Sequence, residues 1–409
     1  LTPLQYIKLN SLMKPYMLVD YSHNGAYTSM MIANWYGLPF FDDCDYVSKQ
    51  EFSHGHQTAV QKKIVLIDWM LYTELLDNCD FFDFSWANLV ISVTTEQVPL
   101  GFVKLIEQGI DFFNNPNTIH LVNGIATIKK DRLDKFLTNK NILFPYNHFF
   151  CTVASANDEN MYNDITMKYR PYLFEALLGA KKSPRSYIYY KLRDSNLLSV
   201  SLVNLTSSGV FNKNEFINSL EILDQWGKQI PDDYRSKALD MFDNDEDKSV
   251  HSSTYTNTRF TRITSGTPTK PARISELIPT GVYQNSWYSL ITETNLGSGI
   301  LFITEKTAKV LFGRRIFIFF GTSGHLQHLK TLGFKTFDGI LDESYDNEPD
   351  HNKRFEMAWK QVEFLATQDP VEIYQLAKPI LDHNYELAKD IKTLMTPAYN
   401  FIQNRINSL

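Results

Sequence analysis

The chain has 409 residues, of which 43% are hydrophobic and 14% aromatic. Because a single core seldom extends beyond about 250–300 residues, this length favours two domains, and the composition excludes an intrinsically disordered chain. A formal net charge of −6 counts against a general nucleic-acid coat, which needs a basic surface, although a local basic cleft stays open.

No apolar run approaches the roughly 18–20 residues that span a bilayer. The first ten residues, LTPLQYIKLN, lack the apolar core of a signal peptide. We therefore expect a cytoplasmic protein without a membrane span. The three cysteines, Cys44, Cys79 and Cys151, are scattered without a CxxC spacing, which favours reduced, buried thiols over zinc ligands or disulfides.

The first part of the chain alternates short apolar runs with helical patterns. Helical patterns cover residues 25–35 and 101–113, and the apolar runs cover residues 16–21, 63–69, 88–96 and 117–124. This alternation is typical of a parallel, doubly wound α/β sheet. We expect an N-terminal Rossmann-like domain over residues 1–155, with an Asn- and Asp-rich link at 152–166.

A second α/β domain is expected over residues 168–380. It starts with a strand at 170–179 and an amphipathic helix at 184–198. Residues from about 205 to 280 contain the acidic run DNDEDK and a Ser/Thr/Pro-rich stretch, which indicate an irregular insertion.

Ordered patterns return at residues 286–295 and continue to the end of the chain. A strand, helix, strand and helix are expected from Phe302 onward, with the second strand at 315–321 and the second helix within 322–333. The amphipathic pattern that begins with VEIYQ predicts one or two helices, and residues 381–409 form the expected C-terminal helical segment.

The stretch LFITEKTAKVLFGRRIFIFFG, residues 301–321, places charges directly before an apolar strand. Thr304 is the expected N-cap of a helix from Glu305 to about Phe312, with Gly313 as its stop. Lys306 at the second helical position opposes the helix dipole at a cost of about 0.3–1 kcal/mol, unless an anion lies there. A bound phosphate would reverse that cost, whereas an exposed helix start with ordinary surface charges is the simpler alternative.

The segments ITETN (291–295) and FITEKTAKVLFGRRIFIFFG (302–321) resemble the nucleotide-sugar-binding signature of α1,3-fucosyltransferase-like enzymes. The continuation HLKTLGFKTFDGILDESYDN (328–347) is similar to phage- and bacterium-borne glycosyltransferase-like proteins. The resemblance covers 290–355 and extends weakly to 177–198. It implies a GT-B fold, with two Rossmann-like lobes, a deep interdomain cleft and C-terminal helices, in a bacterial or infected-host cytoplasm.

The resemblance also implies a set of donor-binding residues. Glu305 would hold the ribose or sugar hydroxyls, Lys306 would neutralise the leaving diphosphate, and Arg185 would contact phosphate from the opposite side. Glu293 and Thr304 would line the same pocket. The chemistry requires fixed cations, because the nucleoside diphosphate gains negative charge as it leaves an oxocarbenium-like centre. No metal and no cofactor besides the donor substrate are expected.

An acceptor hydroxyl needs a general base near its line of attack. Glu96 follows the apolar run 88–96 and is the preferred candidate, since fucosyltransferase-like enzymes carry a Glu shortly before a Pro in their first lobe, although the spacing differs here. Asp20 and Asp68, also at strand ends, are rivals. Asp43-x-Asp45 has the form of a metal-binding DxD, but we interpret it as an acidic loop that faces water.

The sequence thus predicts an inverting, metal-independent glycosyltransferase that uses a nucleoside-diphosphate sugar. The acceptor is a glycan or a hydroxymethylated base of phage DNA. The acidity of the chain weighs against DNA, because DNA phosphates require a basic track. The alternative is a non-catalytic binding or virion-associated protein that retains a glycosyltransferase-like fold.

Overall fold

The computed structural model describes part of the chain, namely a set of strands, helices and connecting residues. The described residues are 16–20, 44–48, 64–69, 89–94, 117–122, 125–128, 142–143, 153, 170–180, 183–206, 278–293, 300–390, 396, 400–405 and 407–408. The chain divides into two compact units, one formed by residues 1–148 and 392–409 and the other by 149–391. The boundaries expected at 155, 168 and 380 stay predictions.

The first unit contains a six-stranded parallel sheet in the order β2-β1-β3-β4-β5-β7. Its strands are β1 (Tyr16–Asp20), β2 (Cys44–Ser48), β3 (Ile64–Trp69), β4 (Leu89–Thr94), β5 (Thr118–Val122) and β7 (Ile142–Leu143), and β6 (Ile125–Ile128) follows β5. The parallel sheet expected from the alternating apolar runs is confirmed. The helices expected at 25–35 and 101–113 lie outside the described residues.

Strand β2 corrects the interpretation of the DxD pattern. Asp45 lies within β2 and pairs with Met17 of β1, so it is part of a strand rather than of an acidic loop. The sequence analysis missed this strand because CDYVS contains only a short apolar segment between polar residues.

The second unit is built on a four-stranded parallel sheet in the order β12-β10-β8-β9. These strands are β8 (Tyr172–Ala180), β9 (Ser201–Thr206), β10 (Ser286–Thr292) and β12 (Ile316–Phe320), and the short strand β11 (Ile300–Phe302) precedes α15. The helices are α10 (Ser183–Asp194), α14 (Thr280–Asn285), α15 (Glu305–Phe312), α16 (His325–Thr331), α17 (His351–Thr367) and α18 (Pro370–Lys389).

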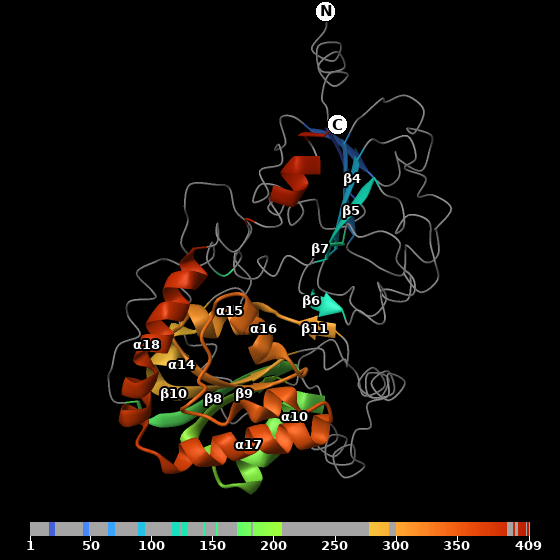
Figure 1. The fold of residues 1–409 in the computed structure, drawn as a ribbon. Helices are drawn as coiled ribbons and strands as arrows, with labels where there is room; N and C mark the ends of the chain where they lie inside the picture. The colour runs from blue at the N-terminus through green and yellow to red at the C-terminus, as the bar shows by residue number, and fades with distance from the viewer. Residues whose placement is uncertain are drawn as a thin grey trace, which may run out of the picture. The chain divides into compact units, whose positions relative to one another are not determined.

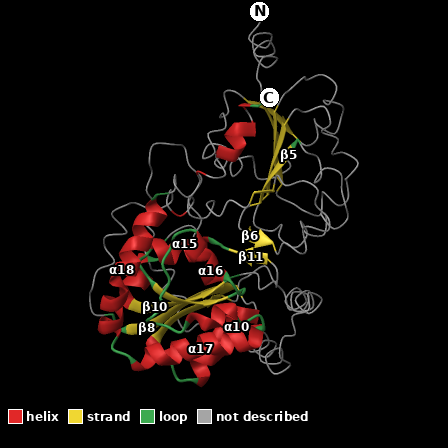
Figure 2. Cartoon of the chain, viewed as in Figure 1, coloured by secondary structure: helices red, strands yellow, loops and turns green. Residues whose placement is uncertain are grey.

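Helices cover both faces of this sheet (Figures 1 and 2). Helices α10 and α17 lie below the sheet in the view of Figure 1, α15 lies above it, and α18 runs along its left side. Tyr187 of α10 packs against Phe355 of α17 and Phe320 of β12, with ring centroids 5.3 and 6.2 Å apart. On the other face, Trp287 of β10 packs against Tyr374 of α18. The second unit is therefore a three-layer α/β structure.

The buried position of the sheet explains the composition of its central strands. Every residue of β10 and of β12 is buried, and β12 reads IFIFF. A strand covered on both faces needs apolar side chains at consecutive positions, whereas a half-exposed strand would alternate. Polar side chains of functional use are consequently confined to the strand ends.

Helix α15 runs from Glu305 to Phe312 with Thr304 as its N-cap and Gly313 as its C-cap, as the sequence predicted. Gly313 does not end the helix through a left-handed conformation. Gly313 has φ −79°, but a Cβ there would lie 2.5 Å from the ring of Tyr283. The left-handed residue is Arg314, with φ 48°.

The elements β9, α14 and α17 were not foreseen by the sequence analysis. Strand β9 joins the sheet edge beside β8, and α17 supplies much of one helical layer. Most of the expected insertion, residues 207–277, lies outside the described part of the chain. Among the helices that the structure describes, none has both the length and the apolar character needed to cross a bilayer.

A buried arginine ties together the amino-terminal ends of the strands in the second unit. Arg315, only 1% exposed, donates to the carbonyl oxygens of Tyr283 and Ser286 and to the hydroxyls of Ser286 and Ser289. Arg170 donates to the same Ser286 carbonyl at 2.9 Å. Burial raises the pKa of Glu175, and the charge of Arg315 opposes this effect. Each nitrogen of the Arg315 guanidinium thus donates to a protein group, which gives Arg315 a structural role.

We expect Arg315→Met to lower the free energy of unfolding by about 3–5 kcal/mol, because it leaves a buried carboxyl and several buried acceptors without their donor. Urea unfolding monitored by tryptophan fluorescence measures the change. Arg193→Met is the matched control, since the Arg193 side chain is 44% exposed and its ion pair contributes less than about 1 kcal/mol. Equal unfolding midpoints for Arg315→Met and the wild type would refute the structural role.

Candidate functional site

The candidate site lies at the carboxyl ends of the parallel strands of the second unit. Glu293 directly follows β10, and the loop after the neighbouring strand β12 leads into α16 at His325. In the sequence Thr304 lies between β10 and β12, and it is the N-cap of α15. Ligands of open α/β sheets bind at this edge because the loops and helix N-termini converge there.

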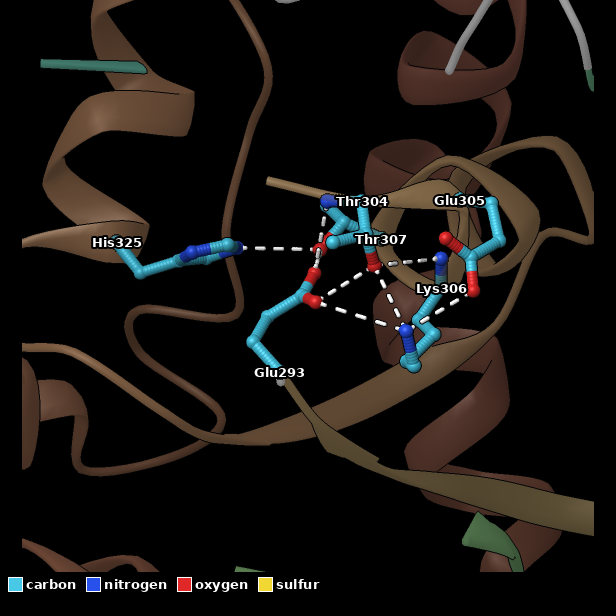
Figure 3. Close-up of polar contacts among 6 residues, drawn as sticks. All are labelled: Glu293, Thr304, Glu305, Lys306, Thr307 and His325. Atoms are coloured by element: carbon cyan, nitrogen blue, oxygen red, sulfur yellow. Dashed lines mark hydrogen bonds and ion pairs between the residues drawn. The ribbon is translucent and has the colours of Figure 1, made fainter. Parts of the chain in front are cut away.

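Glu293 is the centre of the site (Figure 3). Its side chain is 1% exposed, and it accepts hydrogen bonds from the Thr304 N–H at 3.0 Å, the Thr304 hydroxyl at 2.6 Å and the Thr307 hydroxyl at 3.0 Å. All three donors belong to the N-cap and first turn of α15. The carboxylate of Glu293 therefore binds the N-terminus of this helix, where the dipole favours negative charge.

Lys306 folds back over the same helix start. Its ammonium group donates to Thr304 Oγ1 at 3.0 Å and to Glu305 Oε1 at 2.9 Å, and it lies 3.9 Å from Glu293 Oε2. The Lys306 backbone N–H also donates to Thr304 Oγ1, at 3.4 Å. The anion that the sequence argument required near Lys306 is thus already supplied by the chain, as two carboxylates.

Burial and charge compete in this cluster. Burial raises the pKa of Glu293, which the nearby Lys306 opposes, and burial alone would raise the pKa of Glu305 as well. For Glu305 the charges of Lys306 and Lys309 outweigh burial and hold the pKa below its usual value. Burial would lower the pKa of Lys306, but Glu305 and Glu293 raise it, so the lysine is charged.

Arg185 belongs to the same charged cluster. It lies on α10, it is 7% exposed, and its Nη1 is 3.6 Å from the position that a Cβ of Gly179 would take. Gly179 has φ +61°, which favours glycine. Burial lowers the pKa of Arg185, while the charges of Glu305 and Glu293 oppose that shift. Arg185 therefore interacts electrostatically with Glu293 and Glu305, which lie on a different segment of the sequence.

One carboxylate oxygen of the cluster retains free accepting capacity. Glu305 is 9% exposed, and its Oε1 accepts from Lys306. Its Oε2 is buried and has no hydrogen-bond partner among the residues that the structure describes. A buried carboxylate oxygen without a donor is costly, and a ligand hydroxyl would relieve that cost.

The helix N-termini at this edge are capped by the protein itself. At α16, Asp346 accepts hydrogen bonds from the N–H groups of Leu326 and Gln327, at 3.1 and 2.9 Å. At α15, Glu293 and Thr304 have the same role. An anionic ligand would accordingly be held by the side chains of Lys306 and Arg185 rather than by these N–H groups, which differs from the mode expected from sequence.

The expected general base stays a prediction. Glu96 lies outside the described residues, two positions after the end of β4. The rival candidates are Asp20, the last residue of β1, and Asp68, the last but one of β3, and the two are paired in register with each other. No group of three or more His, Cys, Asp or Glu side chains that could hold a metal is found in the described part of the chain.

Sequence reasoning missed Thr307 and His325. Thr307 is fully buried and bonds to Glu293, and His325 lies 3.3 Å from the Thr307 hydroxyl. Thr307 could have been found from its spacing, because it follows the N-cap Thr304 by three residues and shares its side of the helix. His325 had a weaker signal, namely its position just after a glycine-containing loop at the end of an apolar strand.

Comparison of the chain with protein-family models, with curated proteins and with solved structures gave no match.

The burial of His325 makes a pH-dependent contribution to stability. Burial lowers its pKa well below the ordinary value, so the folded chain keeps it neutral while the unfolded chain binds a proton below about pH 6.5. Stability is therefore lost as the pH falls. Between pH 7 and pH 5 the wild type should lose about 2 kcal/mol more than His325→Gln. Urea unfolding at both pH values measures this, and parallel losses would contradict the assignment of a neutral His325.

Proposed function

We propose that this protein is a glycosyltransferase that moves a sugar from a nucleoside-diphosphate sugar to an acceptor hydroxyl. The single observation that carries the proposal is the charged cluster at the carboxyl end of the sheet in the second unit. Two cationic side chains, Lys306 and Arg185, share it with the buried carboxylate of Glu305. These residues also lie in the segments that resemble the donor-binding signature of fucosyltransferase-like enzymes.

The cluster combines the two kinds of group that a sugar nucleotide requires. A diphosphate leaving group needs cations, and Arg suits it because the guanidinium can bind two phosphate oxygens at once. Ribose and sugar hydroxyls need acceptors, which Glu305 Oε2 would supply. The proposed mechanism is inverting and independent of metal ions, with the two cations stabilising the negative charge that develops on the diphosphate.

The order of the strands supports two Rossmann-like lobes. In the first unit the order β2-β1-β3-β4-β5 is that of a common doubly wound sheet, and β12-β10-β8-β9 follows the same rule when its strands are numbered within the second unit. Both sheets are parallel throughout. In a GT-B enzyme the acceptor would bind across the cleft between such lobes.

A glycan is the favoured acceptor over a hydroxymethylated base of phage DNA. The chain has a formal net charge of −6, and a duplex requires several phosphate contacts from Lys and Arg. A glycan is neutral or acidic and is recognised by hydrogen bonds.

One observation favours the alternative, a non-catalytic protein that retains this fold. The N-terminus of α15 is closed by Glu293 and Thr304, and the side chain of Lys306 is only 20% exposed. A chain that no longer binds a donor could keep these contacts for stability alone. The two functions differ in whether a nucleoside diphosphate binds.

We expect a nucleoside diphosphate to raise the melting temperature of the wild-type protein. At about 100 times Kd the stabilisation is about 2.7 kcal/mol, which corresponds to about 5–10 °C for a domain of this size. Lys306→Met should remove most of the shift, since it retains the aliphatic part of the side chain but loses the charge. A thermal-shift screen of several nucleoside diphosphates measures both effects.

The control for this screen is Lys353→Met, which removes an exposed lysine from α17 and should retain the full shift. If no nucleoside diphosphate stabilises the wild type, the glycosyltransferase proposal is wrong and the non-catalytic alternative holds.

The general base is tested separately from donor binding. We expect Glu96→Gln to lower sugar transfer by about 10²–10⁴-fold without changing the affinity for the nucleoside diphosphate, because a general base acts on the acceptor. Transfer from the donor found in the screen is measured with an array of glycans. Asp20→Asn and Asp68→Asn are measured in parallel, and a comparable loss in either variant with full activity in Glu96→Gln would reassign the base.

A further inference from the structure

His325 is a buried titratable residue that the proposed chemistry does not use. It is fully buried as the first residue of α16, directly after Gly324, which has φ +85°. Its ring stacks on that of Phe319, with centroids 3.5 Å apart, and its Nε2 lies 3.3 Å from Thr307 Oγ1. Its Nδ1 has no hydrogen-bond partner among the residues that the structure describes.

The direction of the hydrogen bonds around Glu293 follows from counting protons at Thr304. The Thr304 hydroxyl oxygen accepts two hydrogen bonds from Lys306, one from its backbone N–H and one from its ammonium group. A hydroxyl has two lone pairs and one hydrogen, so the remaining hydrogen donates to Glu293 Oε2 at 2.6 Å. Glu293 thus accepts at this oxygen, as a carboxylate does.

The same count fixes the tautomer of His325. The Thr307 hydroxyl donates its only hydrogen to Glu293 Oε1, which also accepts from the Thr304 N–H. Thr307 can therefore only accept from His325, which requires hydrogen on Nε2. His325 is the Nε2–H tautomer, and its unprotonated Nδ1 faces a buried site.

Donors consequently converge on the Glu293 carboxylate from two sides. One chain runs from His325 through Thr307, and the other runs from Lys306 through Thr304, as Figure 3 shows. Hydrogen bonds in such chains polarise and strengthen one another in a low-dielectric interior. The position of Glu293 therefore depends on His325 as well as on its direct partners.

We propose that His325 is a positioning residue for the donor site: through Thr307 and Glu293 it fixes where the Lys306 ammonium group lies. This role rests on the proposed function, in which Lys306 faces the diphosphate. The contact between His325 and Thr307 also connects the loop after β12 with α15, the helix that follows β10 and β11. If His325 were displaced, Thr307 would no longer be fixed on the side of Glu293 Oε1. The Glu293 carboxylate could then move, and its contact with the Lys306 ammonium group would weaken.

The test uses pairs of variants that separate the ring, the donor and the hydroxyl. His325→Phe retains an aromatic ring for stacking on Phe319 but has no donor, and Thr307→Val retains the shape but has no hydroxyl. Each should weaken nucleoside diphosphate binding by about tenfold, since coupled neighbours in a polar network interact by energies of this order. Isothermal titration calorimetry measures the affinity.

The conservative partners should regain most of the lost affinity. His325→Gln places an amide N–H near the position of Nε2, and Thr307→Ser retains the hydroxyl. Thr331→Val, which alters an exposed threonine of the same helix α16, is the control and should bind as the wild type does. Equal affinities for wild type, His325→Phe and Thr307→Val would overturn the proposal.

A double variant distinguishes positioning from general loss of structure. If His325 acts through Lys306, then His325→Phe should cause no further loss of affinity in a Lys306→Met background. Additive losses in the double variant would mean that His325 affects binding by another route and would overturn the proposal.

A second measurement does not depend on any ligand. In protein labelled with ¹⁵N-lysine, the Lys306 ammonium signal, assigned by its absence in Lys306→Met, should shift in His325→Phe and return toward its wild-type position in His325→Gln. An unchanged signal in His325→Phe would overturn the positioning role. If the wild type binds no nucleoside diphosphate but the signal shifts, the proposed function fails while the coupling of His325 to Lys306 stands.

Discussion

The carboxylate of Glu293 binds the N-terminus of α15, and the rest of the site depends on this contact. Glu293 is 1% exposed, so its charge must be balanced within the protein. Its three donors come from Thr304 and Thr307, which join the end of β10 to the first turn of the helix. Lys306 supplies a positive charge 3.9 Å from Glu293 Oε2. A helix start that would otherwise attract an external anion is thus completed by a residue of the neighbouring strand.

The sheet explains why polar groups gather where they do. Strands β10 and β12 are buried along their whole length and contain no charged residue, so the charged residues beside them, Arg315 and Glu293, lie where these strands begin or end. At the beginning, Arg315 donates four hydrogen bonds to protein acceptors, so that each of its three nitrogens has a partner. At the end, the Oε2 of Glu305 has no donor within the described part of the chain. This difference in hydrogen bonding separates a structural cluster from a candidate binding cluster.

The local features of α15 could be predicted from sequence, because caps, periodicity and glycine stops act over a few residues. The bounds of the helix at Glu305 and Phe312 and the N-cap at Thr304 are confirmed. The role of Glu293 in binding the N-terminus of that helix could not be derived from sequence, because Glu293 follows β10 and lies eleven positions before Thr304. His325 was missed for the same reason, and strands β2 and β9 were missed because they acquire their pairing only from β1 and β8.

The charge balance of the cluster decides how an anion could bind there. Lys306, Lys309 and Arg185 carry three positive charges, and Glu293 and Glu305 carry two negative charges, so the formal sum is 3 − 2 = +1. A diphosphate would bring at least two negative charges and would compete with Glu305 for Lys306. Since burial raises the pKa of Glu293, uptake of a proton by Glu293 would raise the sum to +2 and restore the balance. If a diphosphate binds as proposed, this charge count would link its binding to proton uptake by Glu293, and binding would then be stronger at lower pH.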